Sequence, residues 1–298
     1  MRVRRLLACV ALALPGALAA QRNYDTVQVR TLKVANGVYM LMGAGGNIGV
    51  SAGPDGVILI DDQFAPLAPK IRAAVTAVDS GPIRFILNTH WHWDHTGGNE
   101  TFGRSGVLII AQDNVRRRMS VDQFVAAIRD TVRASPAIAL PVVTFSDAVT
   151  FYLNGDSIEA FHVPPAHTDG DVIIRWRHAN VIHAGDTFWN GLYPLIDLSS
   201  GGSVDGMVGA ADRMLALADS ATKIIPGHGP LGDRVALKAY RDMLATVRDR
   251  VRAAIRRGRT LDQIKAAKPT AEFDAQWNHG NMTPDRLVEI LFQDLSKH

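Results

Sequence analysis

The sequence predicts an α/β fold in which two mixed β-sheets pack face to face and helices cover their outer sides. Short β segments separated by glycine occur in two sets along the 298 residues. The order is strands, one helix and strands, then strands, one helix and one strand, and finally a run of helices. Each sheet and each helix must bury an apolar face, and two stacked sheets with helices outside satisfy that requirement. The hydrophobic fraction of 47% is enough for a core of this size.

The first half of the chain carries the first set of strands. They are expected over residues 27–34, 38–42, 47–51, 57–60, 83–87 and 106–111. Gly53-Pro54-Asp55-Gly56 is a strong turn signal between two of them, and a helix is expected over residues 68–78. Residues 114–139 are expected to form a helical insert that carries Met119, Phe124 and Ile128 and ends at Pro136 and Pro141.

The second half repeats the strand pattern and ends in helices. Strands are expected from residue 142 and over residues 149–153, 157–163, 172–176, 180–183 and 223–225. Asn154-Gly155 is a hairpin signal, and a helix is expected over residues 204–218. From residue 233 to residue 298 the spacing of apolar residues predicts a C-terminal helical extension of the same domain, residues 21–298. Its arginines fall largely off the apolar stripe and are expected on a solvated face.

Residues 1–20 are expected to be a secretory signal peptide. Arg2, Arg4 and Arg5 form a basic head, an apolar run follows, and small residues precede the polar start at Gln21. The apolar run is too short for a permanent membrane helix. The mature protein is therefore expected to be periplasmic or secreted, with no membrane attachment after the peptide is removed.

The charge balance of the mature chain argues against a nucleic-acid partner. The sequence has 32 Lys and Arg against 29 Asp and Glu, and three of the arginines leave with the signal peptide, so that 29 of each sign remain. No electrostatic footprint for nucleic acid is left, and a small-molecule substrate is expected instead. The only cysteine, Cys9, also lies in the signal peptide, so the mature chain has neither a disulfide nor a thiolate ligand.

One stretch, residues 88–99, dominates the functional interpretation. It places His90, His92, Asp94 and His95 within six positions, directly after the predicted strand 83–87. Imidazoles two residues apart point the same way from an extended strand end, and the next two side chains fall where the chain turns. Four nitrogen and oxygen ligands so close together suit zinc or a similar divalent ion. They are too many for one closed tetrahedral site, which favours two metals.

Three further residues complete the pattern. His167 lies in a loop between predicted strands, Asp186 ends a strand, and His228 lies in Ile225-Pro-Gly-His-Gly-Pro230 at another strand end. Strand termini on a rigid scaffold can present ligands to one edge of a sheet. A single histidine in any of these places would more often be structural, but the combination favours a metal site.

This set of residues resembles the metallo-β-lactamase superfamily, which is marked by His-x-His-x-Asp-His followed by His, Asp and His in separate loops. The resemblance spans residues 30–230 and implies a four-layer αβ/βα sandwich with a dinuclear zinc site at one edge. It implies that His90, His92 and His167 hold one zinc. It implies that Asp94, His95 and His228 hold the other, that Asp186 bridges the two, and that Asp61 orients an imidazole ligand.

The resemblance also implies a mechanism. Two Zn²⁺ ions sharing a water would lower its pKa toward ~7, and Asp94 would orient the resulting metal-bound hydroxide. Imidazole and carboxylate ligands also suit iron, so iron in one site stays open. Classical β-lactamases usually have Cys or Ser at the position of Asp186, whereas Asp is typical of glyoxalase II-like hydrolases.

The leading interpretation is a secreted dinuclear zinc hydrolase that cleaves an ester, thioester or amide. One alternative is a class B metallo-β-lactamase, and a second is a non-catalytic metal- or ligand-binding periplasmic protein. An apolar acyl group would suit a pocket walled by aromatic residues, with the insert around Met119 as a partial lid. The expected wall residues are Trp91, Trp93, Phe188, Trp189 and Tyr193, although ordinary core positions would also account for several of them.

Overall fold

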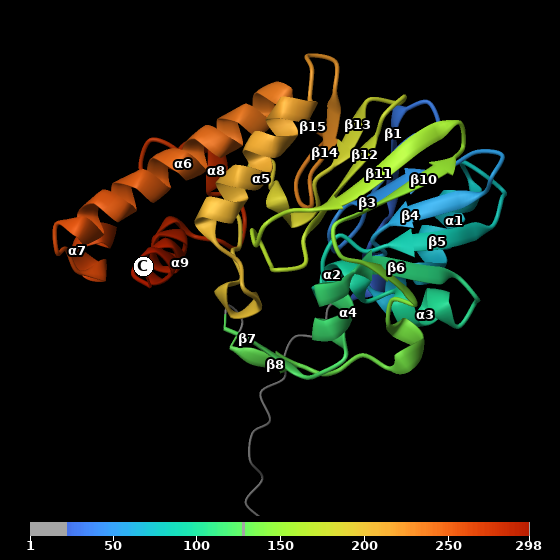
Figure 1. The fold of residues 1–298 in the computed structure, drawn as a ribbon, viewed down its shortest axis with the longest axis horizontal. Coiled ribbons are helices and arrows are strands. Elements are labelled where there is room, and N and C mark those ends of the chain that lie inside the picture. Colours follow the sequence, from blue (N-terminus) through green and yellow to red (C-terminus); the bar gives the residue numbers. More distant parts are fainter. Residues whose placement is uncertain (1–22, 127–128, 298) are drawn as a thin grey trace, which may run out of the picture.

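Two large mixed sheets lie face to face in the computed structural model, which describes residues 23–126 and 129–297 (Figure 1). The predicted signal peptide, residues 1–20, lies outside the described residues. The first sheet has the order β1 (Arg30–Ala35), β2 (Val38–Met42), β3 (Ile48–Ser51), β4 (Val57–Ile60), β5 (Ile83–Leu87), β6 (Leu108–Gln112) and β9 (Val143–Phe145). The second has the order β10 (Ala148–Leu153), β11 (Asp156–His162), β12 (Val172–Trp176), β13 (Val181–His183), β14 (Lys223–Ile225) and β15 (Gly232–Asp233).

Strand β4 shows how the sequence builds the layers. All four of its residues are buried, which explains why its sequence is a continuous apolar run. Because side chains alternate along a strand, Val57 and Leu59 face the outer helix α1 (Ala68–Thr76), while Ile58 and Ile60 face the second sheet. The central sheets are therefore covered on both faces, and the four-layer sandwich expected from the sequence is the observed fold.

The C-terminal helices share one core with the second sheet. They are α5 (Val204–Leu217), α6 (Arg234–Arg256), α7 (Leu261–Ala266), α8 (Asp274–Trp277) and α9 (Pro284–Leu295). Along α6, Leu237, Tyr240 and Leu244 are fully buried at helical spacing. They pack in the same cluster as Phe188 and Tyr193, which lie between β13 and α5. In Figure 1 α6 runs along the outer side of the second sheet and extends past it to α7.

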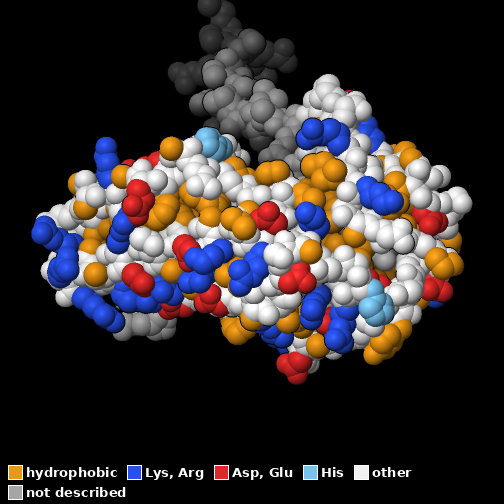
Figure 2. All heavy atoms as spheres, turned by 90° about the horizontal axis from the view of Figure 1, so that it is seen from above, with side chains coloured by type: hydrophobic (Ala, Val, Ile, Leu, Met, Phe, Trp, Pro, Cys, Tyr) orange, Lys and Arg blue, Asp and Glu red, His pale blue; other side chains and the backbone are white. Residues whose placement is uncertain are grey.

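The basic residues of α6 pair with acidic neighbours at the surface. Arg252 lies 2.7 Å from Asp205, and Arg250 lies 2.6 Å from Glu272. Figure 2 shows Lys and Arg interspersed with Asp and Glu over the end of the molecule where α6 and α7 lie. This is the solvated face that the sequence predicts.

The insert is only partly helical, which corrects the prediction for residues 114–139. Helix α4 (Asp113–Met119) ends at Ser120, and the chain then forms a hairpin of β7 (Gln123–Val125) and β8 (Asp130–Val132), followed by a 3-10 turn, η3 (Ala137–Ala139). The physical reason is alternation of period two: Phe124 is 61% exposed whereas Val125 is fully buried. Ile128 lies outside the described residues.

The ends of β5, β13 and β14 meet at one edge of the sandwich. Strands β13 and β14 are parallel, and β12 is antiparallel to β11 and β13, so the chain leaves β13 and β14 on the same side as the loop between β11 and β12. The end of β5 lies at the same edge, because His95 Nε2 in the segment after β5 is 3.1 Å from Asp186 Oδ1 in the turn after β13. The short helix α2 (Trp93–Thr96) lies at this edge (Figure 1). No described helix is long and apolar enough to cross a membrane.

Candidate metal centre

All seven predicted ligands converge at this edge of the sandwich. His90 and His92 lie in the irregular segment after β5, and Asp94 and His95 lie in α2. His167 comes from the loop between β11 and β12, Asp186 from the 3-10 turn η4 (Gly185–Thr187) after β13, and His228 from the loop after β14. The first four ligands thus come from the half of the chain that forms the first sheet, and the other three come from the half that forms the second.

One group consists of three buried imidazoles. His167 Nε2 lies 2.8 Å from His92 Nδ1, and the His90 ring centroid is 4.7 Å from that of His167. His90 Nε2 is buried and has no hydrogen-bond partner among the described residues. A buried imidazole nitrogen without a partner is costly unless something else fills its position.

The second group combines a carboxylate with two imidazoles. Asp94 Oδ2 lies 3.4 Å from His228 Nε2 and 3.8 Å from His95 Nε2. The two imidazole nitrogens are 3.4 Å apart. Asp94 and His228 are 24% and 19% exposed, whereas His95 is fully buried. This group therefore faces the solvent side of the centre.

Asp186 lies between the two groups. Its Oδ1 is 3.1 Å from His95 Nε2, and its Oδ2 is 3.4 Å from both His167 Nε2 and His228 Nε2 and 3.9 Å from His90 Nε2. A single carboxylate therefore reaches ligand atoms of both groups.

Glycine at position 227 makes room for that carboxylate. A β-carbon at Gly227 would lie 2.0 Å from Asp186 Oδ1 and 2.6 Å from the Gly185 carbonyl oxygen. Gly227 N–H also donates to the Gly185 carbonyl at 2.7 Å, which ties the loop carrying His228 to the turn carrying Asp186. The glycines around His228 thus allow a close approach of two backbones, which is a role that glycine serves without steric cost.

Outer hydrogen bonds orient the imidazoles of the first motif. Asp61 has a left-handed backbone (φ 66°) and accepts the Nδ1–H of His95 at 2.8 Å, the type of contact that the resemblance implies. The same carboxylate accepts the Thr89 hydroxyl at 2.7 Å, and Thr89 Oγ1 in turn lies 3.0 Å from His90 Nδ1. With Nδ1 occupied in both rings, Nε2 is the atom that faces the centre.

Two further supports were not found from the sequence. Asp197 Oδ2 accepts the Nε2–H of His92 at 3.0 Å, which leaves Nδ1 of this ring facing inward. The Leu195 carbonyl accepts the Nδ1–H of His167 at 2.8 Å. Asp197 caps the 3-10 turn η5 (Leu198–Ser200). In the sequence, the pattern Asp-Leu-Ser-Ser predicts that Asp197 caps a helical turn. It does not indicate the contact with His92, which lies 105 positions earlier in the chain.

Asn47 holds the loop that carries His228. Its side-chain Nδ2 donates to the carbonyls of Pro226 and Gly229, both at 2.9 Å, and its backbone N–H donates to the Gly227 carbonyl at 2.8 Å. The Asn47 carbonyl accepts the Nε2–H of His183 at 3.1 Å. One residue directly before β3 of the first sheet therefore holds both ends of a loop in the second sheet.

Without metal, burial and neighbouring charges set the protonation of the centre at neutral pH: Asp186 is ionised, His90 and His167 are neutral, and His228 is protonated. Burial raises the pKa of Asp186, but His228 and His95 outweigh it and hold that pKa well below its usual range. Burial lowers the pKa of His90 and His167, so these rings are neutral. Burial would also lower the pKa of His228, yet Asp186 and Asp94 raise it to about 9.

The residues present fit divalent metal ions. Three sets of donor atoms lie within 4.8 Å of one another, namely His90–His92–His167, His90–His95–Asp186 and Asp94–His95–His228. They are imidazole nitrogens and carboxylate oxygens, the donors that zinc and similar ions prefer. The outer nitrogens of His90, His92, His95 and His167 all have a partner, as expected for metal-binding imidazoles.

The predicted aromatic wall is only partly at the site. Trp189 stacks on His228 with ring centroids 4.2 Å apart, and Trp93 is half-buried beside His92. Trp91 is buried and donates its Nε1–H to Ser200 Oγ. Trp91, Trp93 and the buried Met119 line a cavity of about 120 Å³ under the hairpin of β7 and β8.

Phe188 and Tyr193 are core residues, which revises the pocket drawn from the sequence. Both have at most 1% of their surface exposed. Phe188 packs against Tyr240 with ring centroids 5.2 Å apart, and Tyr193 donates its hydroxyl to Asp274 at 2.8 Å. The apolar pattern after Asp186 therefore serves the contact with the C-terminal helices instead of an open pocket.

Comparison with known families identifies the class of hydrolases to which the chain belongs. The model of the metallo-beta-lactamase superfamily matches residues 42–228, which include all seven ligands. The chain belongs to this superfamily, whose members are hydrolases.

Individual relatives are distant and differ in their activities. The chain is 32% identical over 148 residues to a hydroxyacylglutathione hydrolase of Nitrosococcus oceani, covering 48% of this chain and 47% of the relative. It is 24% identical over 148 residues to a type 2 metallo-beta-lactamase of Bacteroides fragilis, covering 50% of this chain and 53% of the relative. The chain thus spans about half the length of these curated relatives.

Among solved structures, an alkylsulfatase from Pseudomonas sp. shares the fold. The sec-alkylsulfatase Pisa1 matches with a TM-score of 0.67 and 19% identity, covering 89% of this chain and 50% of that one. At this identity the likeness concerns the fold alone.

Proposed function

We propose that the protein is a dinuclear zinc hydrolase that cleaves an ester, thioester or amide bond of a small molecule. The observation that carries the proposal is the position of Asp186, whose two oxygens lie 3.1 to 3.4 Å from ligand nitrogens of both groups. His90, His92 and His167 would hold one ion and Asp94, His95 and His228 the other. A bound metal pair supplies a nucleophile at neutral pH by lowering the pKa of water, and it polarises the bond to be cut.

The protein's own groups then orient the reaction. Asp94 is the most exposed carboxylate of the centre, and the oxygen that is not used as a ligand is available to accept a proton from an attacking water. Trp189 stacks on His228 and, with Trp93, gives the open side of the centre an apolar border. The apolar part of an acyl group can pack against these two tryptophans.

An ester or thioester suits the centre better than a β-lactam. The carboxylate of Asp186 is 3% exposed and adds negative charge between the two ligand groups. When a lactam ring opens, a nitrogen anion develops that needs stabilisation in the transition state. A fixed carboxylate nearby weakens that stabilisation, so β-lactam hydrolysis is expected to be measurable but slow. Relatives named hydroxyacylglutathione hydrolase and acyl-coenzyme A thioesterase support the same preference.

The test is a substrate panel on the zinc-loaded protein. We expect turnover of matched thioesters and esters and weak turnover of a chromogenic cephalosporin. A cephalosporin rate that exceeds the thioester rates would favour the β-lactamase alternative. Zinc binding without turnover of any panel member would favour a non-catalytic binding protein.

We also propose that the chain acts in the periplasm or outside the cell. The support is the signal-peptide pattern of residues 1–20. Expression of the full chain in a bacterium tests this. The mature protein is expected in the periplasmic fraction with an N-terminus near Gln21, and an uncleaved chain in the cytoplasm would contradict the proposal.

A further inference from the structure

A chain of hydrogen bonds leads from Trp91 through η5 to His92, the next residue in the sequence. Trp91 Nε1–H donates to Ser200 Oγ at 3.1 Å. The Ser200 hydroxyl donates to Asp197 Oδ2 at 2.5 Å, and the same oxygen accepts the Nε2–H of His92 at 3.0 Å. The chain therefore leaves the first motif, passes through a turn about a hundred positions later in the sequence and returns to a metal ligand.

The chemistry of each group gives this chain one direction. An indole N–H can only donate, an ionised carboxylate can only accept, and a hydroxyl has a single proton to give. The proton of Ser200 therefore goes to Asp197, and the Ser200 oxygen accepts from Trp91. Because the carboxylate is an acceptor, the His92 ring must carry its hydrogen on Nε2, which leaves Nδ1 for a metal ion.

All four members of the chain are buried. The exposed fractions are 3% for Trp91, 2% for Ser200, 1% for Asp197 and 4% for His92. Away from water, hydrogen bonds in a chain strengthen one another, and removing one member leaves its neighbour without a partner. A change at Trp91 or Ser200 is therefore expected to reach His92 although neither residue contacts the position of the ion.

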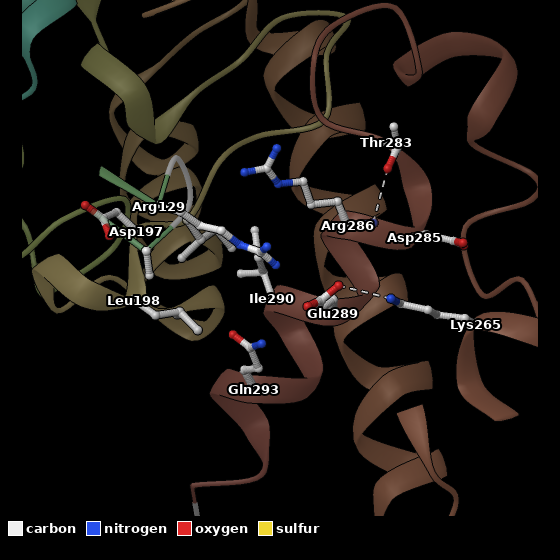
Figure 3. A pocket seen from close by; sticks show the side chains of 12 residues that line it. Arg129, Asp197, Leu198, Lys265, Thr283, Asp285, Arg286, Glu289, Ile290 and Gln293 are labelled. Atoms are coloured by element: carbon white, nitrogen blue, oxygen red, sulfur yellow. Dashed lines mark hydrogen bonds and ion pairs between the residues drawn. The ribbon is translucent and has the colours of Figure 1, made fainter. Parts of the chain in front are cut away.

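The other oxygen of Asp197 is anchored within η5. Oδ1 accepts the backbone N–H groups of Ser199 and Ser200 at 3.0 and 3.2 Å and the hydroxyl of Ser199. The Ser199 hydroxyl oxygen also accepts the backbone N–H of Ala126 in the hairpin of β7 and β8 at 3.2 Å. In Figure 3 the carboxylate points away from Ile290 of α9. The turn thus fixes one oxygen and leaves the other to Ser200 and the imidazole.

The segment around η5 supports one of the two ligand groups. Besides holding His92, it contacts the His167 loop: the Leu195 carbonyl accepts the Nδ1–H of His167 at 2.8 Å, and the Asp197 N–H donates to the His167 carbonyl at 2.9 Å. Among the described residues, its hydrogen bonds reach no member of the group of Asp94, His95 and His228. A disturbance of η5 should therefore affect the group of His90, His92 and His167, which we call the first site.

We propose, on the basis of the two-metal centre of the proposed function, that Ser200 and Trp91 are positioning residues of the first site. The indole N–H of Trp91 orients the Ser200 hydroxyl, the hydroxyl holds the Asp197 carboxylate, and the carboxylate fixes the His92 ring with Nδ1 toward the ion. Trp91 therefore serves metal binding as well as lining the small cavity under the hairpin.

Zinc titration against a chelator, in two single-site backgrounds, tests this proposal. His228→Gln leaves the first site complete, and His167→Gln leaves the site of Asp94, His95 and His228 complete. We expect Ser200→Ala to weaken zinc binding about 10- to 100-fold in the His228→Gln background, as is typical when a group supporting a metal ligand is lost. In the His167→Gln background the same change should leave the affinity as it was.

Trp91→Phe is the milder variant, because it keeps the Ser200 hydroxyl and removes only the group that orients it. Zinc binding at the first site should weaken about 2- to 10-fold, the range for one hydrogen bond. The double variant Trp91→Phe/Ser200→Ala should bind no more weakly than Ser200→Ala alone, because Trp91 acts through the hydroxyl. The visible spectrum of cobalt(II) bound in the His228→Gln background should change in both single variants.

Two matched controls separate this role from general effects of the substitutions. Trp176 is also buried, but its indole N–H has no hydrogen-bond partner among the described residues, so Trp176→Phe should keep the affinity of the first site. Ser296 is exposed, and Ser296→Ala should do the same.

Thermal unfolding of the metal-free variants completes the test. Equal weakening of both sites together with a lower Tm would show a general structural role and overturn the proposal. Unchanged affinity of the first site in both Ser200→Ala and Trp91→Phe would also overturn it. The readout does not need turnover, so a lack of hydrolysis across the substrate panel would contradict the proposed function alone.

Discussion

At the scale of single residues, the metal centre depends on which nitrogen each imidazole presents. His92 faces inward through Nδ1 because Asp197 holds its Nε2, while His90, His95 and His167 face inward through Nε2 because Thr89, Asp61 and the Leu195 carbonyl hold their Nδ1. Each outer partner fixes the tautomer as well as the ring orientation. The ligand types are readable from the sequence, but this choice of nitrogen is not.

Asp94 is the residue for which we predict the largest loss of turnover relative to its effect on the fold. Asp94→Asn keeps the shape of the side chain but removes a charge 3.4 Å from His228 Nε2. Turnover of a thioester should fall at least ~10²-fold, as for other losses of a preorganised polar group. Steady-state kinetics at matched zinc content measure it.

The control for this variant is Asp262→Asn, an exposed change in the first turn of α7. It should leave turnover unchanged. Near-normal rates in Asp94→Asn would show that the attacking water is organised by another group.

The protonation of His228 predicts a pH dependence for metal binding. Asp186 and Asp94 raise the pKa of this ring to about 9 against the effect of burial, so in the metal-free protein it carries a proton at neutral pH. That proton must leave before the ring can bind a metal. Below pH 9 the apparent zinc affinity should therefore fall as the pH falls, by about tenfold per pH unit for each released proton.

Competition with a chelator of known pH behaviour, combined with proton release on zinc addition, measures this dependence. Affinity that stays constant between pH 6 and pH 8 would mean that the ring is already neutral and that the raised pKa is wrong.

At the scale of elements, the irregular loops carry the ligands and the strands place the loops. Asn47, the residue before β3, donates to the carbonyls of Pro226 and Gly229 on the two sides of His228, at 2.9 Å each. Asn47→Ala leaves these two buried carbonyls without their donor, which should lower the free energy of unfolding by about 1–3 kcal/mol. It should also weaken metal binding at the site with His228 more than at the site with His90, His92 and His167.

Denaturant unfolding and zinc titration of Asn47→Ala measure both effects. The control is Asn281→Ala, at an exposed position. Equal loss of both metals, or unchanged binding, would show that Asn47 supports the fold in general and not the His228 loop in particular.

The strands were predictable at this scale, whereas the insert was not. Largely apolar runs such as residues 83–87, 172–176 and 223–225 coincide with β5, β12 and β14, because short apolar runs bounded by glycine or polar residues favour strands. In the insert, Met119 and Phe124 suggested a long helix, but Phe124 points outward on a hairpin. Widely spaced apolar residues are compatible with the period of a helix and with the alternation of a strand. Only the burial of Val125 next to the exposed Phe124 decides for the strand.

At the scale of the whole molecule, the site exists only where the two halves meet. His90 to His95 come from the first sheet, His167, Asp186 and His228 come from the second, and Asn47 and Gly227 join them. The seven candidate ligands were predicted from the motif and its resemblance, and the structure brings them together. The supporting roles of Asp197 and Leu195 could not be predicted, because they depend on where η5 and the segment before it pack.

The C-terminal extension also changes the meaning of the aromatic residues after Asp186. Phe188 and Tyr193 pack with Tyr240 and Trp277 in one core, so these side chains couple the turn that carries Asp186 to α6 and α8. From the sequence alone, an aromatic run beside a candidate ligand is equally compatible with a pocket wall and with a contact in the core. The position of α6 decides between them.

The central claim is that Asp186 joins two metal sites, and the direct measurement is the metal content of Asp186→Ala compared with wild type. Wild-type protein loaded with zinc and freed of excess should contain two equivalents per chain. Because the carboxylate contacts nitrogens of both groups, Asp186→Ala should lose metal from both sites and retain less than one equivalent after the same treatment. One equivalent in fully loaded wild-type protein, or two tightly held equivalents in the variant, would contradict the account.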